Sequence, residues 1–393
     1  MGRVSKSGAR LRIGVSYPGD LDAATTWSGI PHGLINALRE LGAEPVAVPA
    51  QPPKLIDVGL TATLALARAY RIPAETLQER LRVAKTIAMY TGRQMPWIRT
   101  AFARRRILRE QPFDGFIQVG TGYWLPSGIA IATFEDMTVP QAARLPYPEW
   151  RHLSATELRS RRDGQARAYT RAHACCFASA WAADSALREY DLAPGKVHVV
   201  GMGRNRTPRP VDRDWQTPNF LFVGGDWQRK NGPAVLRAFA EVRACIPEAT
   251  LHVVGNHPPL RTDGVVGYGW LSPDDAEDRQ RLQELFEHAT CFVMPSLYEP
   301  FGIVYVEAAA GGLPSIGTNR GGAPEAIGEG GVAIDPESHE ALVAAMLQLA
   351  GPSEAERAGA KARQHAEEFT WRKVTARILD ALNLSLDSVA QRL

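Results

Sequence analysis

Residues 295–311, PSLYEPFGIVYVEAAAG, place two carboxylates, Glu299 and Glu307, on either side of a Pro-Phe-Gly turn. We interpret residues 295–311 as a loop that runs into a helix, because Pro300 ends any regular secondary structure before it and Gly302 lets backbone approach a ligand closely. The first amides of a helix have no intrahelical acceptor, so they form a ready site for an anion. One ligand could therefore meet amides at its charged part and a carboxylate at its hydroxyls. The simpler interpretation is that Glu299 caps the helix and Glu307 faces solvent.

Positive charge follows another predicted strand. Residues 224–232, GGDWQRKNG, come directly after the apolar run FLFV and before a helical pattern. Gly225 allows close backbone approach, while Arg229 and Lys230 supply charge for phosphates. The loop is not a P-loop, because it lacks the G-x-x-x-x-G-K-[ST] pattern. The carboxyl ends of parallel strands meet at one edge of a sheet, so this loop and the two carboxylates would together suit a nucleoside diphosphate sugar.

Two further loops are candidates for ligand contact. Tyr268, Trp270 and Leu271 bring aromatic bulk to a turn that could line a nucleobase pocket, and an ordinary turn with a packed tryptophan is the alternative. Gly29 follows the first predicted strand, where it either approaches a ligand or forms a simple turn. Both loops are predicted at sheet edges, where open α/β sheets bind ligands.

Two acidic residues, Glu135 and Asp136, stand at the end of the predicted strand 129–134. Acidic side chains at the carboxyl end of a parallel strand face the ligand crevice of such a sheet. The alternative is that Asp136 caps the helix that follows. We therefore treat both residues as candidates for a role in chemistry.

The composition is that of an ordinary globular protein. The chain has 393 residues, of which 45% are hydrophobic and 22% are charged, and its net charge is +3. That charge gives no reason to expect sequence-specific nucleic-acid binding. The cysteines are scattered without a C-x-x-C pair, so we expect buried free thiols and neither a metal site nor a disulfide framework. No apolar run reaches the ~18 residues of a membrane helix, which favours a cytoplasmic protein.

An arginine-rich segment, 100–110, has a helical pattern with apolar residues between its basic ones. The preferred interpretation is a solvated helix face. The alternative is contact with an anionic acceptor or with the inner face of a membrane, where the protein would sit peripherally.

Strand and helix patterns alternate along both halves of the chain, and the charged, proline-rich segment 201–218 separates them. The alternation predicts two Rossmann-like α/β domains with a cleft between them. We place the domains at 1–210 and 211–375, followed by a helical segment at 376–393.

The spacing from Glu299 to Glu307, with E-P-F-G-I between and small residues after, resembles the E-x7-E motif of retaining glycosyltransferases. The resemblance is to the family-4 group with the GT-B fold, which includes mannosyl-, glucosyl- and sucrose-forming enzymes. Further segments resemble the group in the same order, namely 28–48, 178–203, 222–239 and 311–336. The similarity is strongest from 219 to 336 and weak from 51 to 112.

This resemblance implies two Rossmann-like domains that face each other across a cleft, with the C-terminal helix returning to the N-terminal domain. It implies metal-independent, retaining transfer from a UDP- or GDP-linked sugar to an acceptor hydroxyl, without a cofactor. The N-terminal domain would bind the acceptor, which could be a small molecule, a lipid-linked molecule or a glycan. The C-terminal domain would bind the donor.

Residue roles carry over by position. Glu307 would bind the donor ribose, Glu299 the hydroxyls of the transferred sugar and Lys230 the diphosphate. Backbone contacts to the donor would come from the turn after Pro300 and from the first domain, at Phe301, Gly302, Ile303 and Gly29.

The chain departs from the family pattern at two positions. Gly225 stands where the family has arginine, so Arg229 is the candidate substitute. Glu135 precedes Asp136 where many members have histidine, which makes Glu135 a candidate contact for acceptor or sugar. Two alternatives remain, a sugar phosphorylase or synthase on the same fold and a sugar-nucleotide-binding protein without catalytic activity.

Overall fold

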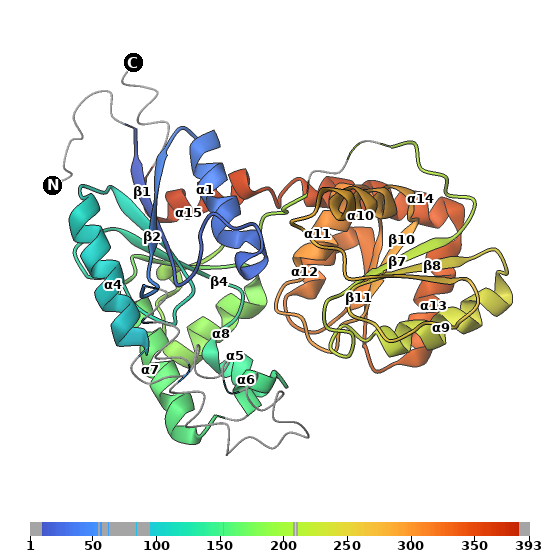
Figure 1. Ribbon diagram of the computed structural model, residues 1–393, viewed down its shortest axis with the longest axis horizontal. Coiled ribbons are helices and arrows are strands. Elements are labelled where there is room, and N and C mark those ends of the chain that lie inside the picture. The colour runs from blue at the N-terminus through green and yellow to red at the C-terminus, as the bar shows by residue number, and fades with distance from the viewer. Residues whose placement is uncertain are drawn as a thin grey trace. The chain divides into compact units, whose positions relative to one another are not determined.

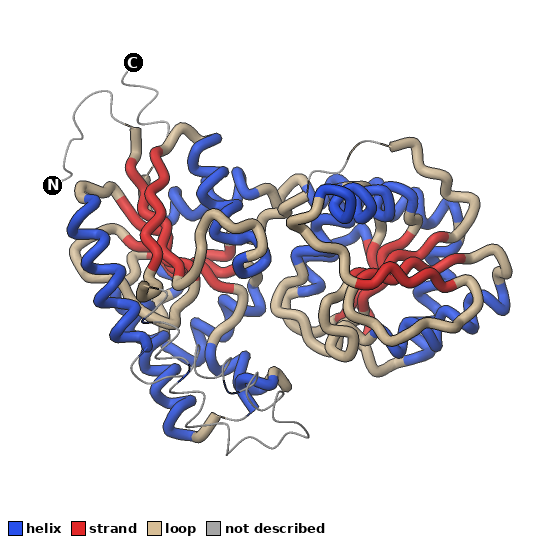
Figure 2. Tube along the Cα trace, viewed as in Figure 1, coloured by secondary structure: helices blue, strands red, loops and turns tan. Residues whose placement is uncertain are grey.

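A computed structural model of the chain describes residues 10–53, 95–151, 153–206 and 211–384, together with positions 56, 62, 84 and 209. Contacts divide the chain into two compact units, Met1–Val200 with Val374–Leu393, and Gly201–Lys373. In each unit a sheet lies between helices (Figures 1 and 2). The predicted functional boundaries at 210 and 375 remain a prediction. The helical interpretation of residues 51–94 lies mostly outside the described residues.

The first unit is built on a six-stranded parallel sheet. Its strands, in sheet order, are β2 (Glu44–Pro49), β1 (Arg12–Tyr17), β3 (Gly115–Val119), β4 (Ile131–Glu135), β5 (Ala174–Phe177) and β6 (Val197–Val199). The helices assigned around it are α1 (Ile30–Glu40), α4 (Met95–Glu110), α5 (Val139–Arg144), α6 (Pro148–Arg151), α7 (Ala155–Arg171) and α8 (Ala180–Tyr190). Every residue of β3 and β4 is buried, as expected for strands covered on both faces.

The second unit repeats this plan with another six-stranded parallel sheet. Its strands, in sheet order, are β12 (Gly331–Ile334), β11 (Ser315–Thr318), β10 (Cys291–Met294), β7 (Asn219–Val223), β8 (Thr250–Val254) and β9 (Val265–Gly269). Its helices are α9 (Gly232–Cys245), α10 (Ala276–His288), α11 (Ile303–Ala310), α12 (Ala323–Ile327), α13 (His339–Ala350) and α14 (Pro352–Ala366). The predicted fold class, two Rossmann-like α/β domains with parallel sheets, is confirmed.

The chain passes between the units at 200–201 and again at 373–374, inside helix α15 (Trp371–Ala381). Within the first unit, Arg377 Nη1 of α15 donates to the carbonyl oxygen of Val200 at 3.1 Å. Leu382 and Leu384 lie beside Gly115, where an added Cβ would come within 2.7 Å of Leu384 Cδ1. The described end of the chain therefore packs against the strand that begins at Gly115.

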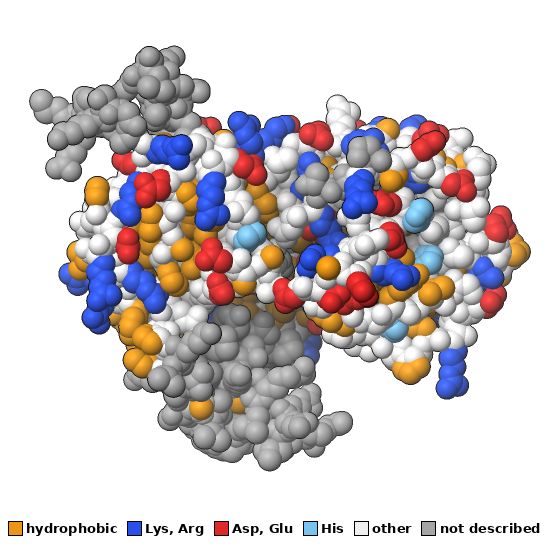
Figure 3. Space-filling view, turned by 45° about the horizontal axis from the view of Figure 1, so that its top comes forward, with side chains coloured by type: hydrophobic (Ala, Val, Ile, Leu, Met, Phe, Trp, Pro, Cys, Tyr) orange, Lys and Arg blue, Asp and Glu red, His pale blue; other side chains and the backbone are white. Residues whose placement is uncertain are grey.

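The surface and the cysteines add two facts. Lysine and arginine are mixed with aspartate and glutamate on the face seen in Figure 3, in line with the small net charge. Cys175, Cys176 and Cys291 are buried as expected, whereas Cys245 at the end of α9 is exposed. The expectation of burial is wrong for Cys245, because the last turn of an amphipathic helix can turn even a small apolar residue to solvent. Among the described residues, no helix is long and apolar enough to cross a membrane.

Candidate functional site

Glu299 and Lys230 meet at the ends of two neighbouring strands. Strand β10 pairs with β7, so the loop after β10 comes beside the loop after β7. Lys230 Nζ donates to Glu299 Oε2, and Arg229 Nη1 lies 3.4 Å from the same oxygen. Ser296 Oγ donates to this oxygen as well, at 3.2 Å. The fold thus joins the two stretches that the sequence singled out, and it adds Ser296, a polar residue of the same loop.

This cluster carries an excess of positive charge. Burial by itself would raise the pKa of Glu299, but the charges of Lys230 and Arg229 outweigh it and hold the pKa below its usual range. Burial lowers the pKa of Lys230, and the Glu299 carboxylate opposes this shift. Asp226 Oδ2 lies 3.9 Å from Arg229 Nε, but its side chain is 57% exposed, so solvent screens it. Two partly buried cations therefore share one buried carboxylate.

Arg229 also ties the two loops together. Its Nη1 donates to the carbonyl oxygen of Tyr298 at 3.2 Å, and its guanidinium carbon lies 5.6 Å from the centre of the Tyr298 ring. In return, the amide of Leu297 donates to the carbonyl oxygen of Arg229 at 2.9 Å. These contacts fix the position of the arginine that we expected to replace the missing family arginine.

Helix α11 begins at a glycine that no side chain could replace without strain. Gly302 is its N-cap with φ 87°, and no side chain caps the helix. An added Cβ would lie 2.5 Å from Tyr305 Cδ2 and 3.0 Å from Glu299 Cγ. The interpretation that Glu299 caps the helix is therefore wrong, because its carboxylate is engaged by Lys230 instead. Phe301 is buried, while Ile303 opens the helix and is partly exposed.

The glycine pair at 321–322 supports the same loop. Gly321 has φ 75°, and an added Cβ would lie 2.0 Å from the carbonyl oxygen of Glu299. The amide of Gly322 donates to the carbonyl oxygen of Pro300 at 3.0 Å. Close packing of backbone on backbone thus holds the Glu299–Pro300 segment in place.

Glu307 is largely but not fully buried, with 9% of its side chain exposed, and it has a partner that the sequence did not suggest. Arg206 Nε lies 3.4 Å from Glu307 Oε2. Burial raises the pKa of Glu307, and both the Arg206 charge and a hydrogen bond from the Asn205 amide oppose the rise. The interpretation that Glu307 faces solvent is therefore wrong. Arg206 lies in an aperiodic segment about a hundred residues earlier, where no local pattern predicts such a contact.

The 268–271 loop reaches Gly225. An added Cβ at Gly225 would lie 3.2 Å from Trp270 Cζ3, and the Trp270 side chain is 58% exposed. Tyr268 points elsewhere, since its hydroxyl lies 2.8 Å from Nδ1 of His252 on β8. Leu271 is half-buried. The structure therefore brings Trp270 to the 224–232 loop, whereas the Tyr268 hydroxyl contacts His252 of the neighbouring strand.

In the first unit, Glu135 is the last residue of β4 and is buried. Its Oε2 accepts hydrogen bonds from Thr121 Oγ1 at 2.5 Å and from Gln165 Nε2 at 2.9 Å. Burial raises the pKa of Glu135 to about 7, although these hydrogen bonds oppose the rise. Asp136 follows it directly, half-buried, in a bend. Glu135 is thus held in a polar network that also includes α7.

Gly29 ends a short 3-10 helix (Thr26–Gly29) and is the N-cap of α1, with φ 76°. It is buried, and its left-handed backbone is the conformation that favours glycine. Gly29 thus lies in the turn between β1 and α1, at the end of β1 where the sequence placed it. Among the described residues, no group of three or more histidine, cysteine, aspartate or glutamate side chains could hold a metal ion.

Comparison with known proteins bears on the second unit most directly. Residues 217–351 match the family model described as Glycosyl transferases group 1. The D-inositol 3-phosphate glycosyltransferase of Rhodococcus jostii (strain RHA1) is 30% identical over 229 residues, which cover 51% of this chain and 50% of the relative. The glycogen synthase of Mycobacterium tuberculosis (strain ATCC 25618 / H37Rv) is 33% identical over 205 residues, covering 47% and 48%. The chain therefore spans about half the length of the curated relatives it matches.

Solved structures resemble nearly the whole chain. The sucrose-phosphate synthase from Thermosynechococcus elongatus aligns with a TM-score of 0.63 at 19% identity, covering 94% of this chain and 98% of that one. WaaG, a glycosyltransferase involved in lipopolysaccharide biosynthesis, aligns with a TM-score of 0.61 at 15% identity, covering 95% and 99%. At such identities the likeness concerns the fold. The second unit thus carries the sequence pattern of the glycosyl transferases group 1 family, in a chain with a GT-B-like pair of Rossmann-like units.

Proposed function

We propose that the protein is a retaining glycosyltransferase, which moves a sugar from a nucleoside diphosphate sugar to an acceptor hydroxyl without a metal ion. The observation that carries this proposal is the cluster in which the partly buried Lys230 and Arg229 meet the buried Glu299, in the loops that follow β7 and β10. The family match over residues 217–351 supports the reaction class.

The cluster suits a diphosphate leaving group. As the bond to the sugar breaks, negative charge grows on the phosphate oxygens, and fixed positive groups stabilise that charge without having to reorganise. Lys230 and Arg229 are held in place by Glu299, which Ser296 orients, and Arg229 also donates to the Tyr298 carbonyl, so both cations are preorganised in this sense. The uncapped amides at the start of α11 would add to the same effect.

Glu299 and Glu307 would divide the rest of the donor between them. Glu299 would accept hydrogen bonds from the hydroxyls of the transferred sugar, and Glu307 would bind the ribose. Glu307 is already paired with Arg206, so ribose binding would share or displace that ion pair. The exposed Trp270 ring beside Gly225 offers a flat apolar face on which a uracil or guanine base could stack.

The acceptor would attack from the face that the diphosphate leaves, which retains the configuration of the sugar. The departing phosphate oxygen would take the proton of the acceptor hydroxyl. Gly29 and Asp136 of the first unit would contact donor or acceptor, whereas Glu135 is covered by Gln165 and would act on the ligand only through its neighbours. The acceptor could be a small molecule, a lipid-linked molecule or a glycan.

The test is an assay of UDP- and GDP-linked sugars with a panel of acceptors, in which product configuration is read by NMR. Lys230→Ala should lower kcat by about 10²–10³-fold, the usual cost of removing one transition-state charge contact. Glu307→Ala should weaken donor binding in calorimetry. Arg243→Ala is the matched control, because Arg243 pairs with the exposed Asp263 elsewhere on the unit.

Three further measurements distinguish the proposed function from its alternatives. Activity that persists in EDTA supports metal independence, and product formation from free phosphate would indicate a phosphorylase. Nucleotide binding without turnover on any acceptor would indicate a binding protein. Unchanged kinetics in both Lys230→Ala and Glu307→Ala would contradict the assigned roles.

A further inference from the structure

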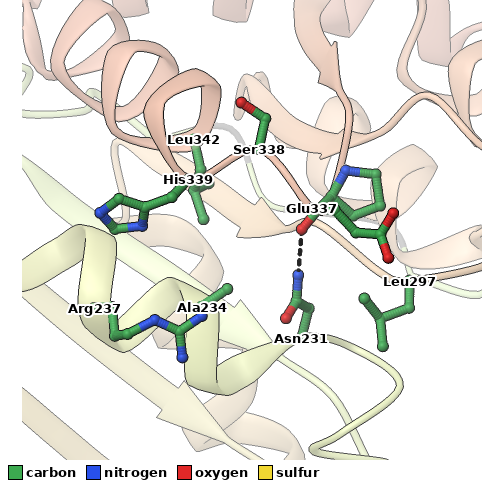
Figure 4. Close-up of a pocket in the computed structure, with 9 residues that line it drawn as sticks. Asn231, Ala234, Arg237, Leu297, Glu337, Ser338, His339 and Leu342 are labelled. Atoms are coloured by element: carbon green, nitrogen blue, oxygen red, sulfur yellow. Dashed lines mark hydrogen bonds between the residues drawn. The ribbon is translucent and has the colours of Figure 1, made fainter.

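A cavity of about 250 Å³ lies in the second unit, between the N-terminal ends of α9 and α13 (Figure 4). Ala234, Leu297 and Leu342 supply apolar parts of its wall. None of the site residues predicted from the sequence lines it. The cavity is therefore a separate feature beside the Lys230–Glu299 cluster.

The polar side chains of the cavity are arranged by charge. Arg237 and His339 lie at one end and Glu337 at the other (Figure 4). The exposed Arg237 has no ion-pair or hydrogen-bond partner among the residues that the structure describes, whereas Glu337 Oε2 is paired with Arg320 Nη2 at 2.6 Å. At the first end His339 Nε2 lies 2.6 Å from Glu241 Oε1, so Arg237 is the cation without a partner there among the described residues. The other end offers a carboxylate that can accept hydrogen bonds.

Asn231 stands between these ends (Figure 4). It is 9% exposed and is the left-handed N-cap of α9, with φ 63°. Its Nδ2 donates to the carbonyl oxygen of Pro336 at 2.8 Å, which fixes the amide and leaves its oxygen as an acceptor. A buried, oriented acceptor of this kind suits a ligand hydroxyl.

Size narrows the ligand class. At ~30 Å³ per water molecule the cavity holds about eight waters, which is room for a monosaccharide. We propose that this cavity binds a phosphorylated monosaccharide, with the phosphate at Arg237 and the hydroxyls at Asn231 and Glu337. The C–H faces of the sugar ring would pack on Leu297 and Leu342.

The cavity and the Lys230–Glu299 cluster share two loops. Asn231 directly follows Lys230 in the chain, and the amide of Leu297 donates to the carbonyl oxygen of Arg229 at 2.9 Å. The two sites are neighbours, but they use different side chains. Binding at the cavity can therefore be measured by itself, whether or not the protein transfers a sugar.

The experiment is isothermal titration calorimetry of the full chain with glucose 1-phosphate, glucose 6-phosphate, inorganic phosphate and glucose. At least one sugar phosphate should bind more tightly than either phosphate or glucose alone. Arg237→Gln should weaken that binding at least ~10-fold, the usual cost of a lost charge-assisted contact. Arg243→Gln removes the same charge from the same helix outside the cavity, and it should change nothing.

Two further variants locate the ligand. Ala234→Met fills the cavity from the α9 side and should abolish binding, while Lys230→Ala should leave it intact. Binding lost in Lys230→Ala but kept in Arg237→Gln would place the sugar phosphate in the diphosphate cluster and overturn the proposal. It would equally be overturned if neither sugar phosphate binds, or if inorganic phosphate binds as tightly as the sugar phosphates.

Discussion

Replacing Glu299 with glutamine tests the charge balance of the Lys230–Glu299 cluster. The change keeps the size of the side chain and its ability to accept hydrogen bonds from Lys230 and Ser296, but it removes the only negative charge that Lys230 contacts among the described ion pairs. Lys230 is 12% exposed and Arg229 is 19% exposed, so neither cation can recover full hydration. The exposed Asp226 near Arg229 would then be the remaining counter-charge for two partly buried cations.

Removing one partner of a buried ion pair costs ~3–5 kcal/mol. The remaining hydrogen bonds and the partial exposure of Arg229 place Glu299→Gln at the lower end, about 3 kcal/mol. At ~2–4 °C per kcal/mol for a domain of this size, the melting temperature should fall by about 6–12 °C. Glu329→Gln, which breaks the exposed pair with Lys361 at 3.5 Å, should leave it unchanged.

The stability loss of Glu299→Gln should become smaller as pH rises. Burial already lowers the pKa of Lys230, and removing Glu299 removes the charge that opposes this shift. In the variant the unfolded chain therefore binds more protons than the folded one as pH approaches the ordinary pKa of lysine, so stability rises with pH. Thermal melts between pH 7 and 10 should show Glu299→Gln regaining part of its loss.

Binding should change in the opposite sense to stability. The unbalanced cations should hold UDP or GDP at least as tightly as the wild type does in calorimetry. Turnover should fall, because under the proposed function the neutral amide is a weaker acceptor for the sugar hydroxyls than the carboxylate. Equal melting temperatures for Glu299→Gln and wild type, or weaker nucleotide binding by the variant, would refute the assignment of excess positive charge.

Three other substitutions test the supporting contacts. Glu135→Gln removes a carboxyl group whose pKa is raised to about 7 in the folded protein, so wild-type stability falls between about pH 4.5 and 7, where the unfolded chain has already lost this proton. Over that range the variant should gain up to ~3 kcal/mol in free energy of unfolding relative to wild type, measured by chemical denaturation. Parallel pH curves for the two proteins would contradict this. Gly321→Ala should lower the free energy of unfolding by ~2–3 kcal/mol, because of backbone strain and the clash with the Glu299 carbonyl. Gly269→Ala is the control, with left-handed φ but open space around the new Cβ, and should cost ~1 kcal/mol. Equal losses would mean that the backbone contact does not contribute to stability. Arg206→Gln should lower the free energy of unfolding by ~1–3 kcal/mol near neutral pH, and by less as pH falls, because the largely buried Glu307 then takes up a proton. A loss that does not depend on pH would argue against the ion pair.

The fold and the central contact were within reach of the sequence because they depend on local patterns. Fully buried parallel strands are short apolar runs, and β3 and β10 were recognisable for that reason. The meeting of Lys230 with Glu299 follows from strand order, since loops after neighbouring parallel strands share one edge of the sheet. Gly302 marked the turn that precedes α11, whereas the backbone contact of Gly321 with the Glu299 carbonyl became evident only in the structure.

The contacts that were missed are set by tertiary packing. Arg206 reaches Glu307 from an aperiodic segment, so neither periodicity nor spacing could pair them. Glu135 reads as a strand-end acid that faces a crevice, but Gln165 of α7 covers it and donates to it. The cavity beside Asn231 needs α9 and α13 side by side, although they are about a hundred residues apart in the chain.

Gly225 shows how a departure from a family pattern can be compensated in space. An arginine at this position would start from a Cβ only 3.2 Å from the Trp270 ring, so the two large side chains exclude each other unless the ring moves. The exposed ring occupies that space, and the second cation comes instead from Arg229, whose guanidinium is fixed by Glu299 and the Tyr298 carbonyl. Arg229 and Lys230 thus keep positive charge in the 224–232 loop, while the Trp270 ring lies over Gly225. Under the proposed function, a site that has an indole in place of a cation gives up electrostatic attraction to phosphate and gains stacking area, so the nucleobase should contribute correspondingly more to donor affinity.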